Sequence, residues 1–259
     1  MLKWGFVLKE YFGKRLQLHF LIVFCSSVLV SVCYAKDTLQ SSVSPEFPSG
    51  LHAKYLNYIA SKLDVELVIT PLTFARRIVE LQNGNLDIVV GLSPVYTKET
   101  GFILLKPSYE SLQNTIFIKN TDHQKISTLE SFKQSTLAVT IGGTYFEHID
   151  NNDWPALVKV SSLEQKIGLL EKDRVDGFIH FAPSTIKVLD TNNRIIIPAK
   201  FQTDSPQGYY FALSKKSKLM SRVAELEGII ARGKLNGDFK NIREQHYLPN
   251  KGNPQRSFK

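Results

Sequence analysis

The chain has 259 residues, of which 43% are hydrophobic and 22% charged, and its formal net charge is +8. This length and composition fit a globular protein of one or two domains and exclude a largely disordered chain. The basic residues are scattered and form no stripe interleaved with aromatic residues, so nucleic acid is not an expected partner.

Residues 1–35 have the layout of a secretory signal peptide. A basic start is followed by an apolar stretch at 18–32, and Cys33 and Ala35 place small residues before Lys36. The apolar stretch has about 15 residues, fewer than the ~20 that a membrane-spanning helix needs. We therefore expect cleavage after Ala35 and a mature protein in the periplasm. An uncleaved membrane anchor stays open as an alternative, because the basic region before the apolar stretch is long.

Both cysteines, Cys25 and Cys33, lie in this N-terminal segment. The mature chain would therefore have no disulfide, no thiol nucleophile and no cysteine ligand for a metal. The six histidines include no pair at the spacing of helical metal ligands. We predict neither a metal site nor a cofactor.

The first part of the mature chain predicts a parallel α/β unit. Apolar residues recur every four positions over 51–63, which predicts a helix, and 64–69 alternates in the manner of a strand. A second helix is predicted at 74–81 and ends near Gly84, because glycine readily adopts the left-handed cap conformation. A short buried strand at 87–91 follows, and strand, helix and strand in this order favour parallel pairing.

A second α/β unit follows with the same order of elements. Residues 137–141 are rich in β-branched side chains and predict a strand, which runs into a glycine turn and a helix start at 142–144. A later helix is predicted at 163–170, and a buried strand at 177–180. The chain therefore contains two similar α/β units.

One phrase occurs in both units at a separation of 89 positions. Residues 81–91 read LQNGNLDIVVG and residues 170–180 read LEKDRVDGFIH, with leucine first and aspartate seventh in each. Each copy predicts a helix end, a turn and a buried strand. Asp87 and Asp176 are interpreted as structural, since a carboxylate there can accept backbone N–H bonds in the turn. Chance likeness between two helix–turn–strand joints is the alternative.

Two apolar strands, at 115–119 and 209–213, connect the units, and two helices follow the second. If these helices return to the first unit, the fold is a two-lobed α/β fold with two hinge crossings and a ligand cleft between the lobes. The predicted first lobe is discontinuous and comprises 36–117 and 211–259. The predicted second lobe comprises 118–210.

The segment 70–91, TPLTFARRIVELQNGNLDIVVG, resembles the core of the bacterial extracellular solute-binding proteins of family 3. The return strand and terminal helices at 208–248 resemble the end of the same family. The resemblance implies a type 2 periplasmic-binding-protein fold whose two lobes close on a small ligand and deliver it to an ABC-type membrane importer. The residues that match the family pattern are Phe74, Arg76, Gly84 and Asp87.

Two departures from the family pattern concern the ligand. Amino-acid binders of the family carry an arginine after the first-lobe loop, where this chain has Thr97-Lys98-Glu99-Thr100. They also carry an aspartate after the second buried strand, where this chain has His180-Phe181. Without both halves of this clamp, a standard α-amino acid is not expected, although Lys98 could replace the missing cation as a point charge. The sequence as a whole favours a small polar solute with a negative group.

Candidate ligand-binding residues lie where the strands end and at the helix starts. In the first lobe, Phe74 is predicted to form an aromatic wall for the ligand and Arg76 to contact an anion. In the loop after the buried strand, Gly91 would allow close approach of the backbone, and Ser93 and Thr97 would offer hydroxyls. The neighbouring Arg77 is expected to be solvated. The structural alternatives are a core aromatic residue, a surface ion pair and ordinary turn positions.

In the second lobe the glycine turn presents backbone N–H groups at a helix start, which is a typical anion site. The candidates there are Gly143, Thr144 and Tyr145, with helix capping as the alternative. His180 and Phe181 end the second copy of the phrase, and Phe47 and Tyr109 are candidates by family position. All four have a core position as their alternative.

Three functions remain open at this point. The first is a monomeric binding protein without catalysis, whose partner is a membrane transporter or sensor. The second is a sensor domain tethered by an uncleaved N-terminus. The third is a dehydratase-like enzyme, with His148, Asp150 or His180 as acid or base, but no serine–histidine–acid or paired-carboxylate spacing supports it, so no catalytic residue is predicted.

Overall fold

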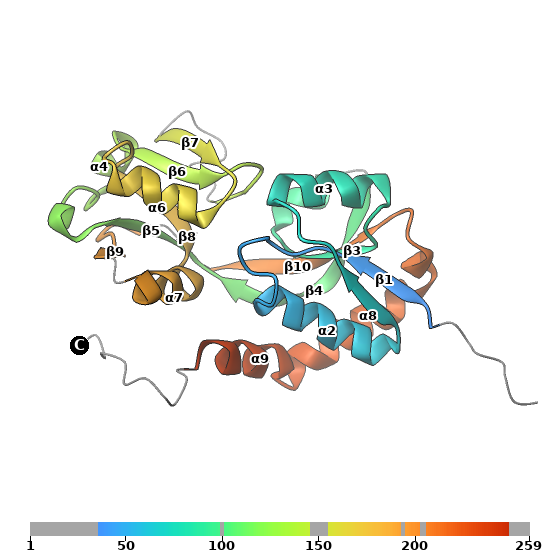
Figure 1. The fold of residues 1–259 in the computed structure, drawn as a ribbon. Helices are drawn as coiled ribbons and strands as arrows, with labels where there is room; N and C mark the ends of the chain where they lie inside the picture. The colour runs from blue at the N-terminus through green and yellow to red at the C-terminus, as the bar shows by residue number, and fades with distance from the viewer. Residues whose placement is uncertain (1–35, 99–100, 146–154, 193–194, 203–205, 249–259) are drawn as a thin grey trace, which may run out of the picture. The chain divides into compact units, whose positions relative to one another are not determined.

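The computed structural model describes residues 36–98, 101–145, 155–192, 195–202 and 206–248 (Figure 1). The predicted signal peptide and the helix expected after Thr144 lie outside these residues. In the described part of the chain, no helix is both long enough and apolar enough to cross a membrane. From residue 38 onward the chain forms one compact unit with two five-stranded sheets.

The first sheet has the order β2-β1-β3-β10-β4. Its strands are β1 (Thr38–Ser41), β2 (Glu66–Ile69), β3 (Ile88–Leu92), β4 (Phe102–Leu112) and β10 (Gln207–Ser214). Strand β1 pairs in parallel with β2 and β3, whereas β10 runs antiparallel to β3 and β4. The parallel pairing predicted for the first unit is confirmed.

The second sheet has the order β7-β6-β8-β5-β9 and repeats this arrangement. Its strands are β5 (Asn114–Lys119), β6 (Thr136–Thr140), β7 (Ala156–Val160), β8 (Gly177–Phe181) and β9 (Ile196–Pro198). Strand β6 pairs in parallel with β7 and β8, and β5 runs antiparallel to β8 and β9. We call each sheet with its helices a lobe.

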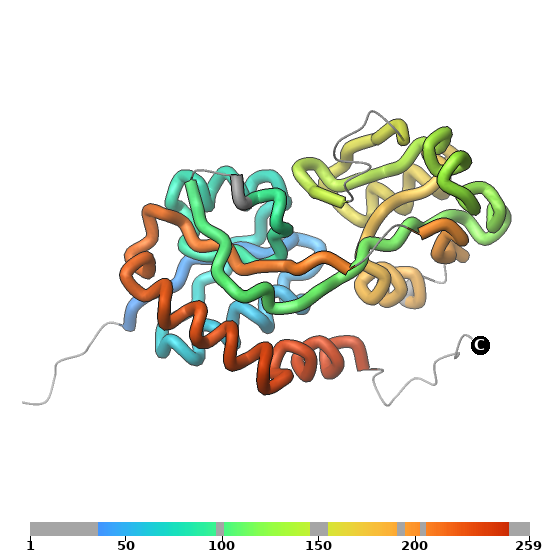
Figure 2. Tube along the Cα trace, turned by 180° about the vertical axis from the view of Figure 1, so that it is seen from behind, coloured from blue at the N-terminus to red at the C-terminus, as the bar shows by residue number. Residues whose placement is uncertain are grey.

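The helices cover both faces of each sheet (Figures 1 and 2). They are α2 (Leu51–Leu63), α3 (Phe74–Asn83), α4 (Leu129–Lys133), α6 (Leu163–Glu171), α7 (Ala182–Asn192), α8 (Val223–Leu235) and α9 (Asp238–Tyr247). Short 3-10 helices are η1 (Pro94–Lys98), η2 (Asn120–Asp122) and η3 (Lys218–Arg222). Helices α8 and α9 pack on the first sheet together with α2, so the chain returns to the first lobe as expected.

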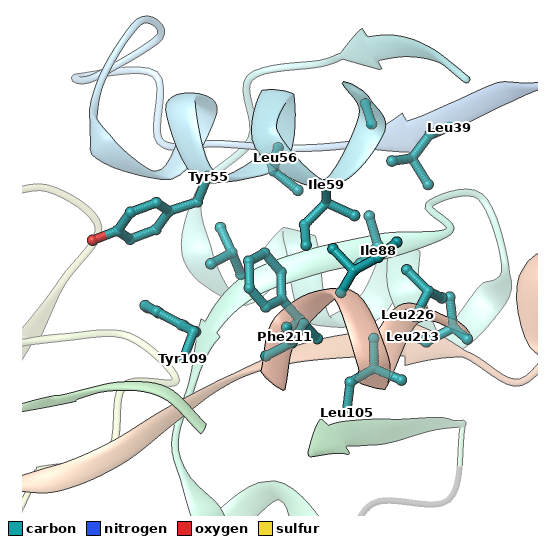
Figure 3. Packing of buried hydrophobic residues seen from close by; sticks show 14 of the residues in the cluster. Leu39, Tyr55, Leu56, Ile59, Ile88, Leu105, Tyr109, Phe211, Leu213 and Leu226 are labelled. Carbon is teal, nitrogen blue, oxygen red and sulfur yellow. The ribbon is translucent and has the colours of Figure 1, made fainter. Parts of the chain in front are cut away.

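Strand β3 shows why its run of apolar residues is buried on both faces. Ile88 points into the core that α2, α8 and α9 cover (Figure 3), and Val90 belongs to the same core. Val89 points to the opposite face, where Leu81 of α3 packs. Because successive side chains of a strand alternate between faces, only a strand covered by helices on both sides is apolar throughout.

The repeated aspartates make the same contact in each lobe. The Asp87 N–H donates to the Gln40 carbonyl at 2.8 Å, and its Oδ2 accepts from the Gln40 N–H at 2.8 Å. Asp176 exchanges the same pair of bonds with Thr136, at 2.8 and 2.7 Å. The structural interpretation is confirmed, but the partner N–H lies in the adjacent strand region and not in the turn. Each aspartate therefore ties its joint to the neighbouring parallel strand.

Both predicted lobe boundaries fall inside strands. The chain leaves the first sheet at Gln113, between β4 and β5, so residues 114–117 belong to the second sheet. It returns before Gln207, so residues 207–210 belong to the first sheet. The apolar stretches that the sequence presents as connectors are therefore members of the sheets.

Candidate functional site

The two lobes contact each other around two loops that follow strand ends. Ser93, just after β3, lies 2.5 Å from Thr144 between their hydroxyl oxygens. Tyr96 donates its hydroxyl hydrogen to the Gly142 carbonyl oxygen. A Cβ placed on Gly142 would lie 3.8 Å from the Phe74 ring. We call these five residues the inter-lobe surface, and it brings together three residues predicted to bind ligand: Phe74, Ser93 and Thr144.

Gly91 makes room for a histidine that the sequence analysis did not include. Its φ of +96° is unfavourable for other residues, and a Cβ there would lie 2.7 Å from the His52 ring. His52 stands in the first turn of α2. Burial, and then the charge of Arg77, lower the pKa of His52 to about 3, so its ring is neutral and can donate or accept a hydrogen bond.

The second-lobe turn is shaped by two of its predicted ligand residues. The buried Tyr145 accepts the Thr140 N–H at its hydroxyl, and a Cβ on Gly143 would lie 2.8 Å from that hydroxyl. These contacts give Gly143 and Tyr145 a role in the turn itself. Thr144 is the member of the turn whose side chain reaches the first lobe.

Arg77 corrects the expectation of a solvated side chain. It is only 6% exposed, and its guanidinium carbon lies 5.1 Å from the centre of the Phe74 ring. In the described part of the chain its side chain has no carboxylate or hydrogen-bond partner, and its Nε is buried without one. Burial lowers the pKa of Arg77 to about 10, so it remains a cation.

The neighbouring Arg76, predicted as the anion contact, is exposed and forms an ion pair with Glu80 on the same helix. The helical period explains the exchange of roles. Arg77 follows Phe74 by three positions and precedes Leu81 by four, so it shares their buried face. Of the two arginines, Arg77 is the one next to the inter-lobe surface.

Lys166 is a second buried cation that the sequence analysis did not include. It is 0% exposed, and its Nζ donates to the Ile179 carbonyl at 2.8 Å and lies 3.4 Å from His180 Nδ1. The Tyr145 ring centre is 6.0 Å from the same Nζ. Burial lowers the pKa of Lys166 to about 7, and Glu46 opposes this shift. Burial also holds the pKa of His180 well below its usual value, with Lys166 adding to the effect.

The remaining predicted residues take different places. Tyr109 lies in the first-lobe core, 5.1 Å from Phe211 between ring centres (Figure 3). Phe47 belongs to the loop before α2 and packs against a core of the second lobe. Phe181 ends β8 and meets Tyr209 edge to face at 5.2 Å. The side chain of Thr97 lies outside the described residues, and so does any contact it makes.

Glu46 links the lobes through a helix end. Its two carboxylate oxygens accept the backbone N–H groups of Leu163 at 2.9 Å and Glu164 at 3.1 Å. These are the first residues of α6, where free N–H groups and the helix dipole favour an anion. A first-lobe loop therefore caps a second-lobe helix beside Lys166.

Among the described residues, no group of histidine, cysteine, aspartate and glutamate is arranged to hold a metal ion. The polar groups at and near the inter-lobe surface include two basic side chains, two neutral histidines and the hydroxyls of Ser93, Tyr96 and Thr144. The Glu46 carboxylate also lies in this region but is engaged by the start of α6. This set is suited to binding an anion and to donating hydrogen bonds to it.

Comparisons with known proteins agree with this architecture. The model of the family described as bacterial extracellular solute-binding proteins, family 3, matches residues 32–249. The probable amino-acid-binding protein YxeM of Bacillus subtilis (strain 168) is 26% identical over 138 residues. The match covers 51% of this chain and 51% of YxeM, so it spans about half the length of that relative.

Solved structures share the fold. An amino acid ABC transporter substrate-binding protein, AbpA from Streptococcus pneumoniae, bound to L-arginine, has a TM-score of 0.68 and 19% identity, covering 81% of this chain and 94% of AbpA. An ancestral arginine-binding protein bound to glutamine has a TM-score of 0.68 and 21% identity, covering 82% and 98%. The GluR0 ligand-binding core with L-glutamate has a TM-score of 0.68 and 17% identity, covering 84% and 100%.

Proposed function

Because the chain belongs to family 3 of the bacterial extracellular solute-binding proteins, we propose that it captures a small polar anion between its lobes for an ABC-type importer. Arg77 is the observation that carries the anionic part of this proposal. A buried cation without a partner is unfavourable in the unliganded protein, and an anion that pairs with it removes that penalty. Phe74, Ser93 and Thr144 supply an aromatic wall and hydroxyls beside it.

Capture would proceed by lobe closure. The contacts of Ser93 with Thr144, and of Glu46 with the start of α6, join the lobes. A ligand that touches both lobes binds the closed arrangement better than the open one and shifts the equilibrium between them. The crossings near Gln113 and before Gln207 are the places where such a hinge would bend.

The proposed organisation follows the sheets. Residues 38–112 and 207–248 would form one lobe and 114–198 the other, after removal of a signal peptide at 1–35. The protein would then act as a monomer in the periplasm, beside its membrane transporter. Catalysis has no part in this proposal.

Standard amino acids are the main alternative class of ligand. The similar proteins are named for amino acids, and the structures hold arginine, glutamine or glutamate. In this chain the end of β8 carries His180 and Phe181, so the acid expected to hold an α-amino group is missing from that place. We therefore rank anions without an amino group above standard amino acids.

The proposal is tested by thermal shift on the protein expressed from its full-length sequence. The panel contains organic acids, the standard amino acids, polyamines, sugars and short peptides. A ligand at ~100 times its Kd stabilises the folded state by ~2.7 kcal/mol, which raises Tm by roughly 5–10 °C. Arg77→Met and Arg76→Met are compared in the same background, and Arg232→Met, an exposed residue of α8, is the control.

We expect an anion to raise Tm in the parent protein and the control and to lose this effect in Arg77→Met. If only Arg76→Met loses the rise in Tm, the exposed Arg76 and not Arg77 is the residue that contacts the anion. A shift given only by polyamines or neutral sugars would contradict the anionic ligand. Chemical consumption of the ligand during incubation would contradict a role limited to binding.

A further inference from the structure

The internal repeat relates the two buried cations to each other. A separation of 89 positions links Leu81 to Leu170 and Asp87 to Asp176, and the same separation links Arg77 to Lys166. Arg77 is the fourth residue of α3, and Lys166 is the fourth residue of α6. The backbone N–H of each donates to the N-cap carbonyl of its helix, at 3.0 and 3.4 Å.

Their surroundings also correspond. Both are more than nine-tenths buried, and neither has a carboxylate within ion-pair distance in the described part of the chain. Each has a neutral histidine as neighbour, His52 for Arg77 and His180 for Lys166. Each also lies near an aromatic ring. The two lobes thus present the same kind of group, a cation flanked by a ring and a neutral histidine.

Both helices begin where the lobes meet. The start of α3 lies against Gly142, since a Cβ there would be 3.6 Å from Ala75. The start of α6 receives the carboxylate of Glu46 from the first lobe. A residue at the fourth position is one turn further along each helix. Arg77 therefore lies one turn beyond a helix start that contacts the second lobe, and Lys166 lies one turn beyond a helix start that contacts the first lobe.

A structural role accounts for these cations less well than a ligand does. Lys166 satisfies one of its three N–H groups firmly, at the Ile179 carbonyl, and Arg77 none in the described residues. A buried charge that serves stability is normally paired, as Glu110 is with Arg243 at 2.6 Å. Two equivalent basic groups, one in each lobe and neither with a carboxylate partner in the described residues, instead fit a solute with a negative group at each end.

We propose that the ligand is a small dicarboxylate, held at one end by Arg77 and at the other by Lys166. This inference rests on the proposed function, since it assumes capture between the lobes. Each carboxylate would form charge-assisted hydrogen bonds with its cation, and the adjacent neutral histidine would donate a further one. A ligand with one carboxylate would pair with the basic group of only one lobe. The second carboxylate would pair with the other lobe, so that binding favours the closed arrangement.

Isothermal titration of the full-length protein tests this inference with charge-matched probes. Succinate and glutarate are the dicarboxylates, succinamate replaces one carboxylate by an amide, and inorganic phosphate is a compact dianion. The variants are Arg77→Met and Lys166→Met, with Lys166→Gln as a second variant that keeps a donor for the Ile179 carbonyl. Lys172→Met is the control, because Lys172 is an exposed lysine at the end of the same helix.

We expect a dicarboxylate to bind the parent protein and the control about tenfold or more tightly than succinamate. Each cation variant should weaken dicarboxylate binding by a similar factor. In Lys166→Gln the preference for succinate over succinamate should shrink to about threefold or less. The variant removes the charge that contacts the second carboxylate, so replacing that carboxylate by an amide should then cost little further affinity. If Lys166 has only a structural role, Lys166→Gln should lower the affinities for succinate and succinamate by the same factor. That result would overturn the inference.

Other outcomes separate this inference from the proposed function. Binding of phosphate without any dicarboxylate would overturn the dicarboxylate class. Binding of an amino acid with the same affinity in parent and variants would overturn the two-cation site and leave solute capture standing. If the parent protein binds no solute of any class in the panel, the proposed function itself fails.

Discussion

Buried charge is handled differently in two regions of this protein. In the first-lobe core, Glu110 is 7% exposed, accepts the Tyr55 hydroxyl at 2.6 Å and pairs with Arg243 of α9 at 2.6 Å. At the inter-lobe surface, Arg77 and Lys166 are buried as deeply and have no carboxylate partner in the described residues. In the first region the fold pairs the buried charge, and in the second it leaves two buried basic groups without a carboxylate partner.

The difference separates a structural charge from a functional one. Pairing inside the core offsets the desolvation of both ions and joins α9 to β4. Burial still raises the pKa of Glu110, although Tyr55 and Arg243 act in the opposite direction. At the inter-lobe surface the same penalty is not offset by the chain, which leaves it for a ligand to remove.

The largest effect on stability is expected from breaking the pair in the core. Arg243→Met leaves Glu110 buried without its counter-charge, so the free energy of unfolding should fall by about 3 kcal/mol. Urea unfolding followed by circular dichroism measures this change. Arg232→Met, which removes an exposed arginine of the neighbouring helix, should stay within about 0.5 kcal/mol of the parent. Equal small losses in both variants would contradict the structural role of the pair.

A smaller effect of opposite sign is expected for Arg77→Met. The variant removes an unpaired buried charge and leaves an apolar side chain against Phe74, so the unliganded protein should gain about 1 kcal/mol. The same urea series, with ligand removed by unfolding and refolding, provides the measurement. A loss of about 2 kcal/mol or more would place Arg77 with Arg243 among the structural charges and remove the contrast between the regions.

The fold was accessible from the sequence because its signals are local. Alternation in β2, the helical stripe of α3 and the glycine that ends α3 at φ +83° each depend on near neighbours. The copied phrase at Asp87 and Asp176 then indicated two equivalent units, which the two sheets confirm. The lobe boundaries were harder to predict. β5 and β10 are apolar strands next to the crossings, and their sequences do not show which of the two sheets each strand joins.

The site could be predicted only in part, because no short sequence pattern shows that a charged side chain is buried. The family pattern of an aromatic residue, a short gap and an arginine indicates Arg76, and charged residues are exposed by default. The helical stripe of Phe74, Arg77 and Leu81 is the signal for the burial of Arg77. Extending the repeat backward from Leu170 by four positions would have singled out Lys166. The cap that Glu46 provides to α6 joins residues far apart in the chain, and no spacing in the sequence predicts it.

The smallest expected effect is the uptake of a fraction of one proton when a dicarboxylate binds. The pKa of Lys166 is about 7 in the unliganded protein, and a carboxylate beside it raises that pKa. The groups facing Lys166 are His180 from β8, Tyr145 from the turn after β6, and Glu46 from the loop before α2. His180 stays neutral because its pKa is held well below the usual value.

The sign follows from the two pKa values of Lys166. Below about pH 7 the lysine is already protonated and affinity should be flat, whereas above it binding must first protonate the lysine, so affinity should fall by at most about tenfold per pH unit. Titrations in two buffers with different ionisation enthalpies measure the protons taken up at pH 7.5. Uptake should persist in His180→Gln and vanish in Lys166→Gln. Affinity that rises with pH over this range would mean that Lys166 does not meet the anion, and the contrast with the core pair would then rest on Arg77 alone.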